Sequence, residues 1–87
     1  MNMVKISGGD GSSFENAIII SDCDHMEGIE QEYIEIRKRF GNYSLIRQNL
    51  LNYKNRKIDK LELKLEDGQQ IEVYFDITEF FGKGFEL

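Results

Sequence analysis

The clearest pattern along the chain is an apolar stripe with helical spacing over residues 25–40. Large apolar residues recur there at intervals of three or four positions: Met26, Ile29, Tyr33, Ile36 and Phe40. Polar residues occupy the opposite positions: Glu30, Glu32, Glu35 and Lys38. Three basic residues end the segment and a glycine follows, an order that complements the helix dipole and stops a helix. The pattern predicts an amphipathic helix whose stripe covers the core.

Four other segments have the patterns of β-strands. Residues 17–21, AIIIS, form a short apolar run that is typical of a buried strand. Residues 43–53 alternate imperfectly, which a bulge or burial on both faces would explain. Residues 58–65 and 70–76 alternate between apolar and polar side chains and are joined through an Asp-Gly pair, so they predict a β-hairpin.

The register of this hairpin follows from its apolar positions. A two-residue loop would set Leu63 opposite a glutamate, whereas a three-residue loop over 66–68 sets Leu63 opposite Ile71 and Leu61 opposite Val73. A slip of one residue would move every side chain to the other face of the sheet. We therefore predict the three-residue loop, with its final glycine in the left-handed conformation.

These segments predict a single α+β domain over residues 14–87. Its order is β-α-β-β-β, with one helix on one face of a four-stranded mixed sheet and the first strand parallel to an edge strand of an antiparallel meander. Residues 1–13 include a run of small polar residues, so we expect a flexible N-terminal arm. Residues 76–82, DITEFFG, resemble a short C-terminal helical turn that Asp76 would cap.

The distribution of charge is more informative than the net charge of −5. Residues 1–35 carry one basic residue against eight acidic ones, residues 36–64 carry nine against two, and residues 65–87 carry one against six. The central basic residues form a candidate nucleic-acid patch: Arg37, Lys38, Arg39, Arg47, Lys54, Arg56 and Lys57. Because these cations can also pair with the abundant acids, nucleic-acid binding is an alternative function rather than the first one.

Cysteine usage and hydropathy indicate the compartment. A single cysteine in 87 residues excludes an internal disulfide, and no apolar run is long enough to cross a membrane. The N-terminal residues lack the apolar core of a secretory signal. We therefore expect a cytoplasmic protein without membrane contact.

Residues 21–25, SDCDH, gather the only cysteine, the only histidine and two carboxylates. They stand just before the predicted helix, where Ser21 or Asp24 can act as the N-cap and Glu27 has the spacing of a capping box. A divalent metal at Asp22 and Asp24 is the second alternative function. However, the calcium-loop pattern fails after these residues, and the chain has no second cysteine or histidine to complete a zinc site. We predict helix capping here, and no metal-binding or cofactor-binding residue.

The same segment does not support catalysis. Two carboxylates flank Cys23 and should raise the pKa of its thiol, and the sequence offers no group to orient His25. We expect no catalytic residue and no enzyme activity.

Phe80 and Phe81 are adjacent aromatic residues near the C-terminus. One helical turn cannot bury both rings equally, so either residue is a candidate for an exposed partner surface beside a sheet edge. Without a catalytic constellation, the predicted function is a non-enzymatic domain that binds another protein, as an adaptor, inhibitor or accessory module.

Two segments resemble signatures of a family of uncharacterised small bacterial α+β domains: GDGSSFENAIII over residues 9–20 and YFDITEFFGKG over residues 74–84. The resemblance spans nearly the whole chain. It implies an α+β fold and no catalytic residue, because no activity is established for that family.

Overall fold

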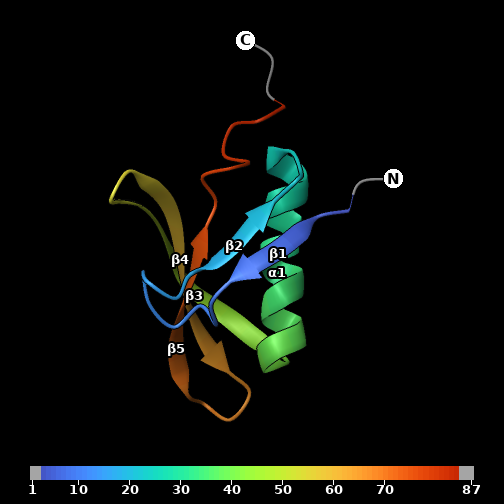
Figure 1. The fold of residues 1–87 in the computed structure, drawn as a ribbon. Helices are drawn as coiled ribbons and strands as arrows, with labels where there is room; N and C mark the ends of the chain where they lie inside the picture. The colour runs from blue at the N-terminus through green and yellow to red at the C-terminus, as the bar shows by residue number, and fades with distance from the viewer. Residues whose placement is uncertain (1–2, 85–87) are drawn as a thin grey trace.

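The computed structural model describes residues 3–84. These residues contain one α-helix and five β-strands: β1 (Lys5–Gly8), β2 (Ile18–Ser21), α1 (His25–Phe40), β3 (Tyr43–Tyr53), β4 (Arg56–Leu65) and β5 (Gln70–Asp76). The strands form a sheet in the order β1-β2-β5-β4-β3, in which the β2–β5 pair is parallel and the other pairs are antiparallel. Figure 1 shows α1 against one face of the sheet, while the tip of the β3–β4 hairpin projects away from the helix.

The strand β1 corrects the expectation of a four-stranded sheet. It pairs antiparallel with β2, and Ile6, together with the preceding Val4, packs against the core. The segment is too short and too polar to show a strand pattern by itself, and pairing with β2 satisfies its backbone hydrogen bonds. β1 lies within residues 1–13, whose flexibility stays a prediction.

The β4–β5 hairpin has the predicted register. Leu63 lies opposite Ile71, and Leu61 lies opposite Val73. Gly68 has a φ of 91°, and its N–H donates to the carbonyl of the last residue of β4 at 2.9 Å. The three-residue loop with a left-handed glycine is therefore confirmed.

A bulge explains the imperfect alternation of β3. The register with β4 shifts between Leu45 and Arg47, which leaves Ile46 as the extra residue. On the two sides of this bulge, Leu45 and Leu50 lie opposite residues of β4 that face the helix. The bulge thus lets both leucines lie on the same face of the sheet as α1.

The core lies between α1 and this face of the sheet. Its members at 1% exposure or less come from β2, β4, β5, α1 and the C-terminal segment: Ile18, Ile20, Ile36, Leu61, Leu63, Val73, Phe75, Ile77 and Phe80. The alternating leucines of β4 are therefore pressed beneath the helix.

The helix α1 packs on the core through a face that is rotated from the predicted apolar stripe: Ile29, Tyr33, Ile36 and Phe40 contact the core, but Met26 does not. Met26 is 69% exposed and Ile29 is only partly buried, whereas Glu32 and Glu35 are 1% and 3% exposed. The assignment of these two glutamates to the solvent side was wrong. Glu32 instead lies in the interior beside Asp59, and Glu35 is covered by its ion pairs with Lys38 and Arg39.

Phe80 explains this rotation of the helix. Its ring packs directly on Gly28, where an added Cβ would lie 2.5 Å from the ring atoms. Gly28 begins a buried row that continues through Glu32 and Ile36, each four residues further along. The Phe80 ring fills the space where a side chain of residue 28 would lie. The row of residues 28, 32 and 36 therefore faces inward, and Glu32 is buried.

After β5 the chain returns in successive turns to the start of α1. The N–H of Phe81 donates to the carbonyl of Ile77 at 2.9 Å, which makes one helical turn. His25 then ties the segment to the helix: its N–H donates to the carbonyl of Lys83 at 2.9 Å, and its Nδ1 accepts from the N–H of Gly82 at 2.8 Å.

Candidate functional site

The strand β3 forms one edge of the sheet and presents exposed apolar side chains there. It has 11 residues and stands last in the sheet order, so one of its sides has no strand neighbour among the described residues. Leu45, Ile46 and Leu50 are 43%, 46% and 51% exposed. The only charged residue of the strand, Arg47, lies 3.7 Å from a carboxylate oxygen of Glu62. Unpaired backbone groups beside apolar side chains make such an edge a template for another strand.

Two hollows lie beside α1, and each includes at least one residue of β3 in its walls. The first has a volume of about 320 Å³ and includes Ile29 and Leu50 in its walls. The second has a volume of about 370 Å³, lies nearer the end of the helix, and includes Ile34 and Tyr43. We use the name β3 surface for the exposed apolar residues of this region: Ile34, Leu45, Ile46, Leu50 and Phe81.

Phe80 and Phe81 lie on opposite sides of the C-terminal segment. Phe80 is fully buried, so it cannot belong to a partner surface. Phe81 is 43% exposed and lines the first hollow together with Leu50. Of the two phenylalanines, only Phe81 contributes to the β3 surface.

A buried carboxyl of the first hollow, Asp59, contacts a second buried carboxyl behind it, Glu32, which does not line the hollow. Asp59 of β4 lines the hollow and Glu32 of α1 lies against Asp59, and each is 1% exposed. The Nε2 of Gln48 donates to both carboxyl oxygens of Asp59, at 3.0 and 2.8 Å. Among residues 3–84, no N–H or hydroxyl donor reaches the oxygens of Glu32, and the carboxyl of Asp59 is within hydrogen-bonding reach. The pair is therefore satisfied only when a proton is held between the two carboxyls.

This proton resides on Glu32. Burial raises the pKa of Glu32 to about 11, and the hydrogen bond with Asp59 and the negative charge of Asp59 add to the shift. Glu32 is therefore a neutral acid at pH 7 and donates its proton to Asp59. Acids with such shifted pKa values beside a hollow are candidates for a functional role.

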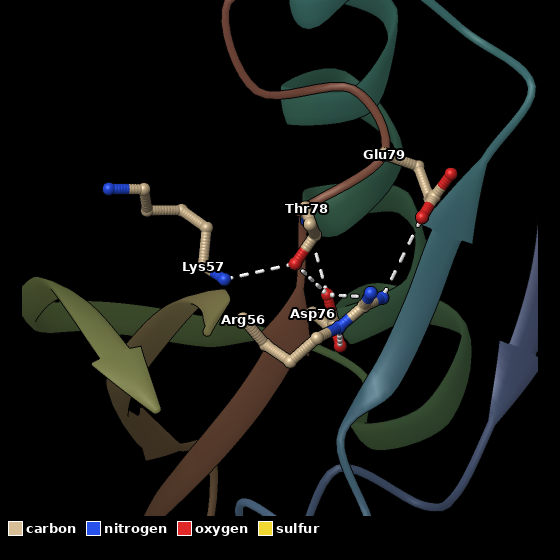
Figure 2. Close-up of polar contacts among 5 residues, drawn as sticks. All are labelled: Arg56, Lys57, Asp76, Thr78 and Glu79. Atoms are coloured by element: carbon tan, nitrogen blue, oxygen red, sulfur yellow. Dashed lines mark hydrogen bonds and ion pairs between the residues drawn. The ribbon is translucent and has the colours of Figure 1, made fainter. Parts of the chain in front are cut away.

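Arg56 and Asp76 form a second polar cluster, on the face of the sheet opposite α1 (Figure 2). Arg56 donates to both carboxylate oxygens of Asp76, at 2.8 and 3.2 Å. Thr78 donates to the same carboxylate through its hydroxyl at 2.7 Å and its N–H at 3.1 Å, so Asp76 caps the turn that follows β5. Figure 2 shows that Lys57 joins through its backbone N–H, which donates to the Thr78 hydroxyl at 2.9 Å, while its ammonium points away.

The cluster at Asp76 holds the C-terminal segment in place. Burial alone would raise the pKa of Asp76, but the hydrogen bonds from Arg56 and Thr78 outweigh burial and hold this pKa below its ordinary value. The cluster joins the start of β4 to the turn that follows β5. It thereby fixes the path that places one phenylalanine in the core and the next at the β3 surface.

Residues 21–25 form the start of the helix. Asp24 is the N-cap: its side chain accepts from the N–H of Glu27, and the carboxylate of Glu27 accepts from the N–H of Asp24, both at 2.9 Å. Ser21 ends β2 and lies outside this capping box. Burial, followed by the negative charges of Glu27 and Asp24, raises the pKa of the Cys23 thiol. Within residues 3–84 there is no group of three acidic, histidine or cysteine side chains that could hold a metal ion.

The seven residues of the candidate nucleic-acid patch each have a partner within the chain. Lys38 and Arg39 pair with Glu35 at 3.4 and 3.3 Å. Arg56 pairs with Asp76. The others contact an acid, an amide or an aromatic ring: Arg37, Arg47, Lys54 and Lys57. The end of α1 and the β3–β4 turn, which carry most of these cations, lie far apart in Figure 1.

The acid pair at Glu32 and Asp59 was missed by the sequence analysis, although the sequence carries a signal for one of its members. Asp59 stands two residues before Leu61, so strict alternation already places it on the apolar face of β4. Glu32 has no such local signal, because its burial depends on the contact between Phe80 and Gly28.

No helix among the described residues is long and apolar enough to cross a membrane. The resemblance of residues 9–20 and 74–84 to a family of small bacterial domains stays a prediction. Comparison of the chain with protein-family models, with curated proteins and with solved structures found no match.

Proposed function

We propose that this domain is a non-enzymatic module that binds another protein by taking an extended segment of that protein along the edge of β3. The observation that carries the proposal is the exposure of Leu45, Ile46 and Leu50 on a strand of 11 residues with one side open. Added strands gain affinity from backbone hydrogen bonds and selectivity from alternate side chains that enter pockets. The two hollows beside α1 supply such pockets.

The opposite edge of the sheet supports the choice of β3. The strand β1 has four residues, includes Lys5 and ends at two consecutive glycines. Short strands with a lysine are a usual way to prevent pairing at an edge. β3 is nearly three times as long as β1, and its single charge is paired within the sheet.

Site-directed crosslinking in the source cell tests the proposal. A photoreactive phenylalanine analogue replaces Leu50 in one variant and Gln69, in the exposed β4–β5 loop, in a control. We expect a discrete polypeptide to be crosslinked from position 50 and not from position 69. A crosslink only between copies of this chain would assign the edge to self-association and overturn the proposal.

Binding of the purified partner is then compared between matched variants. Leu45→Lys should weaken binding at least about tenfold, because it places a charge within the docked apolar surface. Gln69→Lys adds the same charge in the loop and should leave the affinity unchanged. Equal affinities for Leu45→Lys and the wild type would refute the proposal.

A further inference from the structure

We infer that the first hollow binds the nitrogen cation of a lysine or arginine side chain, presented by the segment that docks on β3. This inference names the chemistry of the partner and rests on the proposed function for the source of that side chain. Three features support it: the walls of the hollow, the position of Gln48, and the buried carboxyl of Asp59 in the lining with Glu32 behind it.

The walls of the hollow suit the stem of a basic side chain. The hollow has a volume of about 320 Å³, and its lining is apolar at four residues and polar at three: Ile29, Leu50, Ile77 and Phe81, with His25, Gln48 and Asp59. Lysine and arginine bury an aliphatic stem on apolar surfaces and place the charged group at a polar end. A hollow that combines four apolar side chains with one buried carboxyl is complementary to that shape.

Gln48 already places a nitrogen where the cation would bind. Its Nε2 lies 3.0 and 2.8 Å from the two oxygens of Asp59, so one nitrogen bridges the carboxyl group. An ammonium or guanidinium nitrogen at this point would make the same hydrogen bonds with the added attraction of its charge. Gln48 is an exposed residue of an edge strand, so its side chain can move into solvent when a cation enters.

The surroundings of Glu32, which lies behind Asp59, indicate that no cation of the described residues reaches this carboxyl pair. Its carboxyl is 1% exposed and lies against Asp59, and neither of its oxygens receives a hydrogen bond from an N–H or hydroxyl donor within residues 3–84. None of the ion pairs among the described residues involves Glu32 or Asp59. Buried acids are usually paired with a cation, and here the chain supplies a proton and an amide instead.

Small probes test the hollow without the partner protein. Butylammonium, butylguanidinium and the neutral analogue butylurea are titrated into the wild-type protein, and NMR follows the Gln48 side-chain amide and the methyl groups of Ile29, Leu50 and Ile77. We expect saturable shift changes at these groups with either cation. Butylurea should give none or bind about tenfold more weakly, because it lacks the charge. Equal binding of butylurea, or no saturable change with the cations, would overturn the inference.

Three variants locate the binding. Asp59→Asn should weaken binding of the cations about tenfold, while Asp67→Asn, in the exposed loop, removes the same charge and should have no effect. Gln48→Ala removes the competing amide and should strengthen binding. Unchanged affinity in Asp59→Asn would contradict the inference. If this variant fails to fold, the comparison of charged with neutral probes in the wild-type protein tests the inference instead.

The failure of this inference is distinguishable from failure of the proposed function. A partner that crosslinks at β3 while the probes do not bind would refute the cation site alone. Probe binding without a crosslinked partner would leave the hollow as a cation site and refute docking along β3.

Discussion

Asp59 and Asp76 are buried aspartates on neighbouring strands, at 1% and 7% exposure, and the chain satisfies them in different ways. Asp76 receives hydrogen bonds from Arg56 and Thr78 and ties the C-terminal segment to the sheet. Asp59 receives an amide from Gln48 and a proton held by Glu32. The comparison indicates that a buried carboxylate paired with an arginine of the same chain stabilises the fold. Asp59 has no cation partner among the described residues and lines an open hollow, and it is there that we propose a ligand binds.

Removing the paired aspartate should have the largest effect. Asp76→Ala deletes the acceptor for Arg56 and for both donors of Thr78, and should lower the free energy of unfolding by about 3 kcal/mol. Urea unfolding measures the loss. Asp67→Ala, in the exposed loop, is the control and should be nearly neutral. A comparably small loss in Asp76→Ala would mean that the cluster does not hold the C-terminal segment.

Replacing Glu32 with a side chain that cannot ionise should have the opposite effect on stability. Glu32 stays protonated in the folded protein up to a pKa of about 11 but ionises in the unfolded chain near its ordinary value of 4.5. The unfolded state therefore binds fewer protons, and the free energy of unfolding falls by up to about 1.4 kcal/mol for each pH unit above the ordinary pKa.

Glu32→Gln should remove this loss. The variant keeps a donor for Asp59 but cannot ionise, so we expect it to be more stable than the wild type by about 2 kcal/mol at about pH 6 and equal to it at about pH 4. Unfolding curves at the two pH values measure the difference. A variant that is less stable at both would show that Glu32 is not a protonated buried acid.

Giving Asp59 an arginine partner, as Asp76 has, should have a smaller effect on stability. Gln48→Arg places a cation beside the acid pair and should raise the free energy of unfolding by about 1 kcal/mol at about pH 8. Gln69→Arg adds the same charge elsewhere and is the control. The variant should also lose binding of butylammonium, because its own guanidinium occupies the site. If the variant still binds butylammonium, the guanidinium does not pair with Asp59 as Arg56 pairs with Asp76.

The β3 surface should contribute least to stability. Leu45→Lys alters a side chain that is 43% exposed, so the free energy of unfolding should change by about 0.5 kcal/mol or less. Thermal unfolding checks this value. A loss comparable to that of Asp76→Ala would mean that Leu45 supports the fold, and its effect on partner binding could no longer be read as a contact.

Much of the fold could be predicted because it is encoded in local patterns. Charge order and glycine set the bounds of the helix, and the alternating leucines set the register of the β4–β5 hairpin. β1 escaped prediction because an edge strand of four residues becomes a strand only through pairing with β2. The rotation of α1 escaped it because the cause, Phe80 packing on Gly28, joins residues far apart in the sequence.

The candidate site was less predictable than the fold. The apolar residues of β3 are visible in the sequence, but their exposure depends on the strand order, which places β3 at the edge. Because Phe80 and Phe81 are adjacent, the sequence predicts that one of them is exposed. Which of the two is exposed depends on the packing of α1. The acid pair combines a local signal at Asp59 with the unexpected burial of Glu32.

Backbone amide hydrogen exchange with and without the crosslinked partner tests the central claim most directly. If an extended segment adds to the sheet at β3, amides within residues 43–53 should exchange more slowly in the complex, while those of β1 at the opposite edge stay unchanged. A complex in which the β3 amides keep their exchange rates, or in which β1 gains the protection instead, would contradict the account.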